Sequence, residues 1–252
     1  MIEISNLTKK YENGKTALDD ISFKINPGEI CGYIGTNGAG KTTTIKIISG
    51  SLEFDSGSVI VSHLDVKLKP VEVKKIIGYV PESGNIFNSL TTTEYLLFIG
   101  RIRNIEENII KRRIEYFAEL FNYKEFINTS IGNLSKGTKQ KILITSALMH
   151  NPEIILLDEP LNGLDANSIF IFQDMIKTLS VKGKTIFYCS HLLDMIEKIS
   201  SRLIIIESGK INLDSDTNKL KASENYQGLE SLFKNLKNES KYKKFVYEDI
   251  FD

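Results

Sequence analysis

Hydrophobic residues along this chain fall into short continuous runs, and these runs alternate with segments of helical periodicity. Apolar runs at 154–157, 185–189 and 202–207 have the length of buried strands, and helix-like segments near 169–179 and 192–199 lie between them. Alternation of this kind predicts a largely parallel sheet whose faces are covered by helices. This part of the chain is therefore expected to have an α/β fold.

The first sixty residues contain further short strand patterns separated by turns. Strands are predicted at 2–7, 23–25, 29–34 and 58–61, and a helix is predicted at 41–49. Pro-Gly and Asp-Ser-Gly sequences supply two of the turns, and a glycine directly after the predicted helix is typical of a helix end. The N-terminal part is therefore expected to be rich in strands.

Between about residues 83 and 150 the pattern becomes helical. Thr91 and Glu94 have the spacing of a capping box, which opens one helix. The next helix has apolar residues at the i, i+4, i+7, i+11 spacing of a buried face, namely Ile110, Ile114, Phe117 and Phe121. This stretch is expected to be a helical insertion in the α/β chain.

The residues after Ile211 are mostly polar. One short amphipathic helix is predicted there from Leu229, Leu232, Phe233 and Leu236. The final segment, 238–252, mixes charged and aromatic side chains. Two interpretations of that segment remain open: a docked or frayed terminus, and a regulatory or dimer contact.

Composition and charge narrow the class of protein. The 32 basic and 32 acidic residues balance, so no nucleic-acid partner is expected, although a local basic patch is compatible with this balance. No apolar run is long enough to cross a bilayer, and the N-terminus has no signal-peptide pattern. Cys31 and Cys189 lie in apolar runs, which predicts buried free thiols and no disulfide.

A glycine-rich loop directly after the strand at 29–34 indicates phosphate binding. Residues 35–43, GTNGAGKTT, match the pattern G-x-x-x-x-G-K-[ST], with a predicted strand before them and a predicted helix after. Glycines allow backbone N–H groups to point at phosphate oxygens. Lys41 would reach the β- and γ-phosphates, and Thr42 would bind Mg²⁺. An ordinary glycine turn is the alternative, and it does not explain the strand–loop–helix context. The nucleotide-binding residues predicted here are Gly35, Asn37, Gly38, Ala39, Gly40, Lys41, Thr42 and Thr43.

A second apolar strand ends in two acids, in the sequence IILLDEP at 154–160. We expect this strand to be central in the sheet and to deliver Asp158 and Glu159 to its carboxyl end, where α/β sheets bind ligands. Asp158 suits Mg²⁺ coordination, usually through water. Glu159 would polarise an attacking water molecule. A solvated acidic turn is the alternative interpretation.

Three further motifs, one between these two and two after them, complete a familiar order along the chain. LSKGT at 134–138 is similar to a signature loop commonly written L-S-G-G-Q, and NGLD at 162–165 is similar to a D-loop. Ser190 and His191 close an apolar strand as a switch-histidine loop does. Together with the phosphate loop and the acidic strand end, these motifs resemble the nucleotide-binding subunits of ABC transporters over about residues 1–235.

The resemblance implies a specific domain architecture. It implies an α/β fold with a P-loop NTPase (RecA-like) core, an N-terminal antiparallel β subdomain and an inserted α-helical subdomain. The ATP-binding domain would comprise residues 1–235, with the helical subdomain at about 83–150. Residues 236–252 would form a C-terminal tail.

The resemblance also implies roles for five residues outside the two strand-end motifs. Tyr11 would stack on adenine, His191 would act in catalysis, and Glu82 would bind Mg²⁺. Ser135 and Gly137 would bind the γ-phosphate of ATP held by a partner subunit. Tyr11 as a surface residue and His191 as a neutral strand-end histidine are the alternatives, and the order of the motifs favours function.

Two positions depart from the family pattern. Glu82 stands where the family usually has glutamine, so metal ligation is expected to survive, whereas the switching role of this position stays open. Lys136 stands where the common signature has glycine, and Thr138 stands where it has glutamine. His63 and His150 have no motif around them and are interpreted as structural.

By resemblance, two such subunits dimerise head to tail around ATP and Mg²⁺, and ATP hydrolysis drives a membrane permease. The second subunit could be an identical or a different chain. Ile86 and Phe87 would contact the permease, with buried core as the alternative for both side chains. The subunit would lie in the cytoplasm, peripheral on the inner face of the cell membrane, and export is favoured over import. A soluble ABC ATPase that acts on the ribosome or on DNA is the alternative function, whereas a P-loop kinase or GTPase would leave the signature loop without a use.

Overall fold

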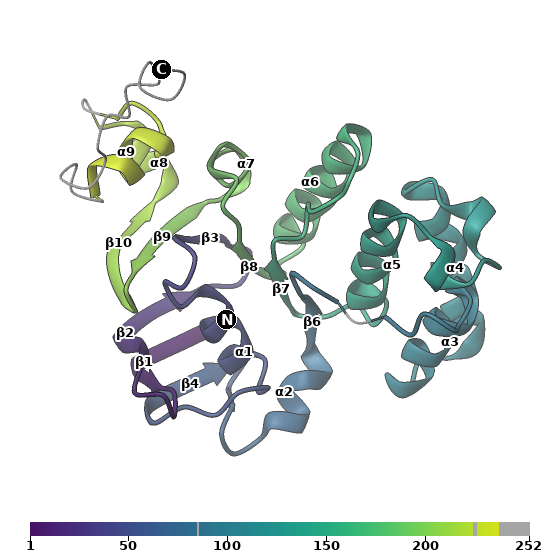
Figure 1. Cartoon of the computed structure of the whole chain (residues 1–252), viewed down its shortest axis with the longest axis horizontal. Coiled ribbons are helices and arrows are strands. Elements are labelled where there is room, and N and C mark those ends of the chain that lie inside the picture. The colour runs from purple at the N-terminus through teal and green to yellow at the C-terminus, as the bar shows by residue number, and fades with distance from the viewer. Residues whose placement is uncertain (85, 224–225, 237–252) are drawn as a thin grey trace, which may run out of the picture.

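The chain folds into two sheets with helices around them, and the computed structural model describes residues 1–84, 86–223 and 226–236 (Figure 1). The first sheet is antiparallel. Its strands lie in the spatial order β2 (Thr16–Ile25), β1 (Ile2–Lys10), β4 (Ser56–Val61) and β5 (Leu64–Asp65). An N-terminal antiparallel sheet is what the sequence resemblance implied.

The second sheet has six strands and is largely parallel. Their spatial order is β10 (Lys210–Asp216), β9 (Arg202–Glu207), β3 (Ile30–Gly35), β8 (Thr185–Cys189), β7 (Ile154–Asp158) and β6 (Ile77–Val80). Among the described residues, only the β10–β9 pair of this sheet is antiparallel. The predicted parallel sheet is confirmed. One detail was wrong: β7 is next to the edge strand β6, and β3 and β8 occupy the centre.

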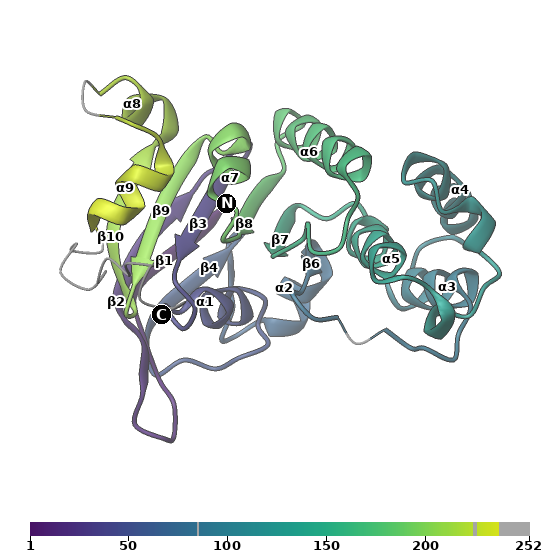
Figure 2. The same cartoon turned by 45° about the horizontal axis from the view of Figure 1, so that its top comes forward.

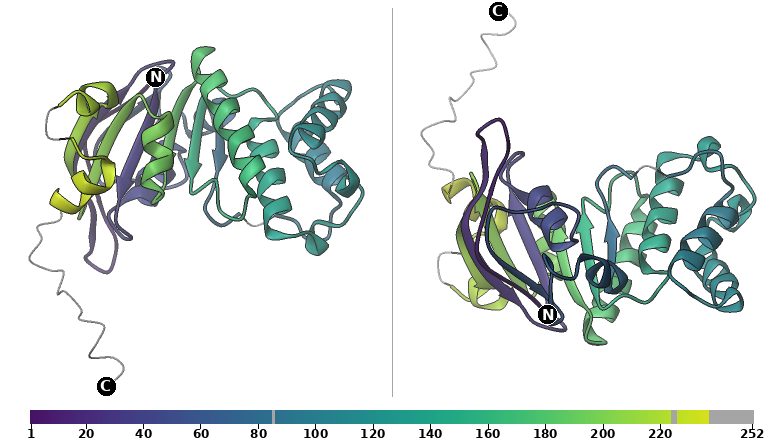
Figure 3. Two further views of the ribbon diagram at one scale, coloured as in Figure 1. Left: turned by 90° about the horizontal axis from the view of Figure 1, so that it is seen from above. Right: turned by 90° about the horizontal axis from the view of Figure 1, so that it is seen from below.

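Helices follow most of the strands and cover the parallel sheet (Figures 1 and 2). Those of the described residues are α1 (Lys41–Ile48), α2 (Pro70–Ile76), α3 (Thr92–Ile102), α4 (Glu107–Leu120), α5 (Lys136–Leu148), α6 (Ala166–Val181), α7 (Leu193–Ile199), α8 (Thr217–Lys221) and α9 (Leu229–Leu236). Two short 3₁₀ helices lie at Lys124–Phe126 and Ile131–Asn133. Viewed from above and below, α3 and α4 lie at the opposite end of the molecule from the antiparallel sheet (Figure 3).

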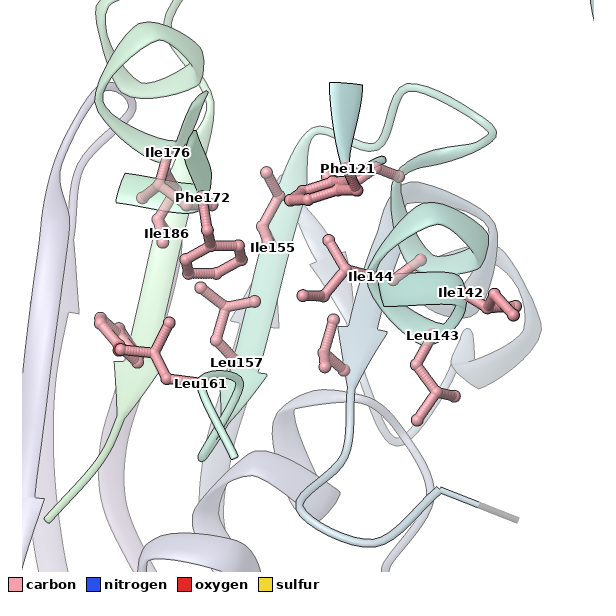
Figure 4. Packing of buried hydrophobic residues seen from close by; sticks show 14 of the residues in the cluster. Phe121, Ile142, Leu143, Ile144, Ile155, Leu157, Leu161, Phe172, Ile176 and Ile186 are labelled. Atoms are coloured by element: carbon pink, nitrogen blue, oxygen red, sulfur yellow. The ribbon is translucent and has the colours of Figure 1, made fainter. Parts of the chain in front are cut away.

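Strand β7 shows why the strands that lead to the site are uniformly apolar. Successive side chains of a strand point to opposite faces of the sheet. Ile155 and Leu157 lie in the core on the side of α5 and α6, whereas Ile154 and Leu156 lie in the core on the opposite face. Figure 4 shows Phe172 of α6 beside Ile155 and Leu157. Both faces are buried, so the apolar run positions the acids that follow it.

The helical stretch agrees with the patterns that predicted it. Thr91 caps α3 through its side chain, which accepts a hydrogen bond from the Glu94 N–H, and the Glu94 carboxylate accepts one from the Thr91 N–H. Ile110 and Ile114 are buried on α4, as predicted. The division of the chain into a domain at 1–235 with an insertion at about 83–150 remains a prediction.

Several elements, α2 and β10 among them, lack the patterns on which the predictions relied. Helix α2 was not predicted, and β10 lies in a segment that was described only as polar. Along β10 exposed and half-buried residues alternate, because an antiparallel edge strand buries little apolar surface. It is held partly by Asp214, whose carboxylate accepts two hydrogen bonds of 2.7 Å from the guanidinium of Arg202 on β9.

Other predictions concern the cysteines, the C-terminal region and the membrane. Cys31 and Cys189 are buried and free, as predicted. The amphipathic helix expected near residue 229 is α9, and the segment 238–252 lies outside the described residues. Within the described ranges, no helix combines the length and the apolar composition that crossing a membrane requires.

Candidate functional site

The loop between β3 and α1 has the backbone geometry that the phosphate-loop motif predicts. Gly38 and Gly40 have φ values of +81° and +117°, which side chains other than glycine rarely adopt. A Cβ at Gly40 would also lie 2.7 Å from the carbonyl oxygen of Ala17. Both glycines are therefore required for the course of the loop, and Gly40 is also required for its packing against β2.

Lys41 begins α1 and lies folded over this loop. Its Nζ donates to the carbonyl oxygens of Gly35 and Thr36, at 2.7 and 3.2 Å. Only 9% of Lys41 is exposed, and no ion pair joins it to a carboxylate among the described residues. A nearly buried ammonium with only carbonyl partners would be stabilised by a polyanion such as a nucleotide phosphate.

Thr42 and Asp158 meet at the edge of the same loop. The Thr42 hydroxyl donates to Oδ2 of Asp158 at 3.1 Å, and Asp158 is 2% exposed. Burial raises the pKa of Asp158 to about 6, and the nearby carboxylates of Glu82 and Glu159 add to the rise. Such a concentration of acidic oxygens would be relieved by a cation.

These oxygens fit Mg²⁺ on chemical grounds. Mg²⁺ prefers oxygen ligands and is usually held by one or two carboxylates together with substrate phosphates and water. Among the described residues, no group of three or more His, Cys, Asp or Glu side chains is arranged to hold a metal ion alone. Thr42 and Asp158 would therefore bind the metal together with a nucleotide, with Glu82 close by.

Glu159 occupies an unusual backbone position at the end of β7. Its φ is +49°, and its N–H donates to the Cys189 carbonyl at 2.9 Å. Its carboxylate accepts hydrogen bonds of 2.8 Å from the Ser190 hydroxyl and from the His191 N–H. The Nδ1 atom of His191 lies 2.9 Å from the same carboxylate. Positive φ at a non-glycine residue costs on the order of 1–3 kcal/mol and concentrates at functional sites.

One pocket of about 510 Å³ brings most of the predicted residues together. Tyr11 lies at this pocket, 39% exposed, with its hydroxyl 3.1 Å from Oγ1 of Thr43. The side chain of Lys15 also reaches the pocket, although no motif indicated it. The pocket is lined by Tyr11, Lys15, Ala17, Asn37, Gly38, Gly40, Lys41, Thr42, Thr43, Glu82, Asp158, Glu159 and His191. Of the predicted phosphate-loop residues, Gly35 and Ala39 do not line this pocket.

Ser135 and Gly137 do not line this pocket. Ser135 is instead the N-cap of α5, where its hydroxyl accepts a hydrogen bond from the Thr138 N–H at 3.1 Å. Helix α5 begins at the next residue, Lys136. Within one chain, the signature loop therefore lies outside the pocket that contains the phosphate loop.

No sequence pattern indicates the contacts between α5 and the loop at 160–165. A Cβ on Gly137 would lie 2.5 Å from the Gly163 carbonyl oxygen. Contacts within its own chain therefore require glycine at position 137, besides any contact with a partner's phosphate. Lys136 is exposed, and its Cγ would lie 3.2 Å from a Cβ placed on Gly163. Its side chain therefore extends along this loop.

Comparisons with known proteins all indicate the same family. The family model described as ABC transporter matches residues 18–162. The ABC transporter ATP-binding protein NatA of Bacillus subtilis is 35% identical over 238 residues, covering 92% of this chain and 96% of that protein. The Nod factor export ATP-binding protein I of Burkholderia thailandensis is 31% identical over 209 residues, covering 83% of this chain and 68% of that protein.

Solved structures agree with the sequence relatives. A structure of an ATP-binding subunit of an ABC transporter superimposes with a TM-score of 0.87 and 26% identity, covering 94% of this chain and 99% of the other. A dimeric structure of a bacterial ABC transporter cassette has a TM-score of 0.80 and 26% identity, covering 86% of this chain and 99% of the other. The fold is therefore that of the ABC ATPase cassettes.

Proposed function

This chain belongs to the ABC transporter family as an ATP-binding, ATP-hydrolysing subunit, and from that premise we propose that it dimerises around ATP to drive a membrane permease. The observation that carries the proposal is the convergence of Lys41, Thr42, Asp158 and Glu159 on one pocket. Phosphoryl transfer to water requires a cation, a hydroxyl–carboxylate pair that can bind Mg²⁺, and a carboxylate fixed in position by hydrogen bonds.

The proposed mechanism assigns a separate task to each of these groups. Lys41 and the loop N–H groups bind the phosphates, while Thr42 and Asp158 hold Mg²⁺. Bound Mg²⁺ supplies neutralisation of charge on the phosphate oxygens. Glu159 orients and polarises the attacking water. The Ser190 hydroxyl and the His191 N–H occupy about two of the roughly four lone-pair sites of that carboxylate, which leaves others for water.

The location of the signature loop supports a dimer. Ser135 and Gly137 begin a helix whose free N–H groups and dipole favour an anion, yet they lie outside the pocket of their own chain. In a head-to-tail dimer they would contact the γ-phosphate of the partner's ATP. Loss of that phosphate by hydrolysis would then weaken the interface and release the two subunits.

The proposed dimer can be tested with Glu159→Gln, which should bind ATP but hydrolyse it slowly. With ATP and Mg²⁺ the variant should elute from size-exclusion chromatography as a dimer. The matched control is the double variant Lys41→Ala/Glu159→Gln, which should remain monomeric because it cannot hold the phosphates. A Glu159→Gln protein that binds ATP and still elutes only as a monomer would contradict the proposal.

An exposed aromatic cluster is our proposed contact for the permease. Phe87 is 55% exposed, and its ring meets the exposed Phe98 ring edge-on at a centroid distance of 5.8 Å. Ile102 on the same helix as Phe98 is also exposed. Ile86, by contrast, is buried, so the buried-core interpretation suits it. Exposed aromatic side chains of this kind are enriched at the centres of protein interfaces.

Through this contact the subunit would act at the inner face of the cell membrane, and we propose that it supports export. The direction rests on similarity to relatives such as the Nod factor export protein. Affinity purification from detergent-solubilised membranes should recover a permease, and Phe87→Asp should reduce the recovery. Phe170→Asp on α6, where Phe170 is 68% exposed, is the matched control. Equal recovery with both variants, or recovery of ribosomes, would argue against this assignment.

A further inference from the structure

The first two turns of α5 are tied to the loop that follows Glu159, and these ties involve residues that the mechanism above does not use. We propose that Gln140 and Lys141 are positioning residues, which make the orientation of Glu159 depend on the signature loop of the same chain. The proposal rests on the dimer proposed above.

Gln140 holds the backbone immediately after the proposed catalytic glutamate. Its Nε2 donates to the Pro160 carbonyl at 2.9 Å, and only 6% of Gln140 is exposed. A buried amide without its partner would be unfavourable, so this contact restrains Pro160 strongly. Because Glu159 has a positive φ and precedes Pro160 directly, a small shift of Pro160 changes where the carboxylate points.

Lys141 holds the other end of the same loop. Its Nζ lies 2.9 Å from Oδ2 of Asp165, and the Lys141 side chain is only 11% exposed. Asp165 also caps α6, where its carboxylate accepts hydrogen bonds from the N–H and the hydroxyl of Ser168, at 2.8 and 2.7 Å. Between the two ends, Gly137 packs against the Gly163 carbonyl. The loop is therefore held at its start, middle and end by α5.

These contacts connect two ATP sites in the proposed dimer. The N-terminus of α5 carries Ser135 and Gly137, which would bind the γ-phosphate of the partner's nucleotide. If that phosphate repositions α5, the loop at 160–165 moves with it, and Glu159 in the chain's own site is reoriented. Hydrolysis in one site should then depend on ATP in the other, which gives a sigmoidal dependence on ATP concentration.

The test removes each tie without removing a group that touches the nucleotide. Gln140→Met keeps the length of the side chain but loses the donor, and Lys141→Met loses the charge. We expect each to lower kcat about tenfold while KM stays within about twofold, because small misplacements of a catalytic group cost up to about a hundredfold. The Hill coefficient for ATP should fall from above 1 in the wild type towards about 1.

Controls separate positioning from general damage. Lys141→Arg keeps the charge and should retain the wild-type kcat and Hill coefficient. Asp165→Asn keeps the cap of α6 but breaks the ion pair. The kcat of the double variant Lys141→Met/Asp165→Asn should therefore be no lower than that of the less active single variant. Thermal unfolding shows whether each variant is folded. If Gln140→Met does not fold, the variants of Lys141 and of the exposed Asp165 still test the proposal.

The outcomes also separate this inference from the proposed dimer. If Glu159→Gln forms the ATP-dependent dimer, but the Met variants keep the wild-type kcat and Hill coefficient, the positioning inference alone is overturned. Additive losses in the double variant would equally overturn the role of the ion pair. If Glu159→Gln forms no dimer, the proposed function fails and this inference fails with it.

Discussion

At Tyr11, the contribution of the ring to ATP binding can be measured separately from that of the hydroxyl. The ring is 39% exposed at the pocket, and the hydroxyl lies 3.1 Å from Oγ1 of Thr43. Hydrogen bonds from the Tyr11 N–H to the Lys15 carbonyl and from the Gly14 N–H to the Tyr11 carbonyl, both of 2.9 Å, hold the turn that presents the ring. If the ring stacks on adenine, Tyr11→Ala and Tyr11→Phe should differ greatly.

The expected magnitudes follow from these contacts. Loss of base–aromatic stacking costs about 1–3 kcal/mol, which corresponds to a rise in KM of roughly 5- to 150-fold in Tyr11→Ala. Tyr11→Phe keeps the ring and loses one hydrogen bond, worth about 0.5–1.5 kcal/mol when buried. Water can replace that bond at this partly exposed hydroxyl, so we expect a rise in KM of about threefold or less.

The assay is phosphate release as a function of ATP concentration, with kcat and KM determined separately. Stacking is made equally in the ground state and the transition state, so kcat should stay close to the wild-type value in both variants. An unchanged KM in Tyr11→Ala would show that Tyr11 is a surface residue that does not contact the nucleotide. A Tyr11→Phe variant as weak as Tyr11→Ala would show that the hydroxyl acts through Thr43 and that stacking is not the main contribution.

Three further predictions follow from the same structure. Lys41→Ala should abolish ATP hydrolysis and weaken nucleotide binding, as measured by phosphate release and equilibrium titration; near-normal turnover would refute the phosphate-loop assignment. Lys136→Gly should change ATPase activity only slightly, whereas Gly137→Asp should nearly eliminate it, because a side chain there meets the Gly163 carbonyl in its own chain; equal inactivity would make Lys136 a direct phosphate ligand. Burial lowers the pKa of His150 to about 4, below its usual 6.5, so the folded state favours the neutral ring, and the free energy of unfolding should fall as the pH drops from about 6.5 towards 4. Urea denaturation at several pH values should show a weaker dependence in His150→Gln, and an unchanged dependence would remove His150 as its source.

The sequence by itself determined the features whose cause is local. The phosphate loop was predictable because its glycines and Lys41 act through adjacent backbone, between a strand and a helix that follow directly. The cap at Thr91 and the apolar run of β7 were predictable for the same reason, since capping and burial depend on neighbouring positions. The order of the motifs along the chain then identified the fold.

Only the tertiary structure decided which distant residues meet. Ser190 contacts Glu159 across 31 positions, and Gln140 contacts Pro160 across 20, yet neither contact produces a periodic pattern. The edge strand β10 was missed because it buries little apolar surface. Contacts between separate elements depend on how those elements pack, and packing is a property of the whole chain. For that reason the sequence determined the groups that we propose to bind phosphate, whereas the tertiary structure determined which residues orient them.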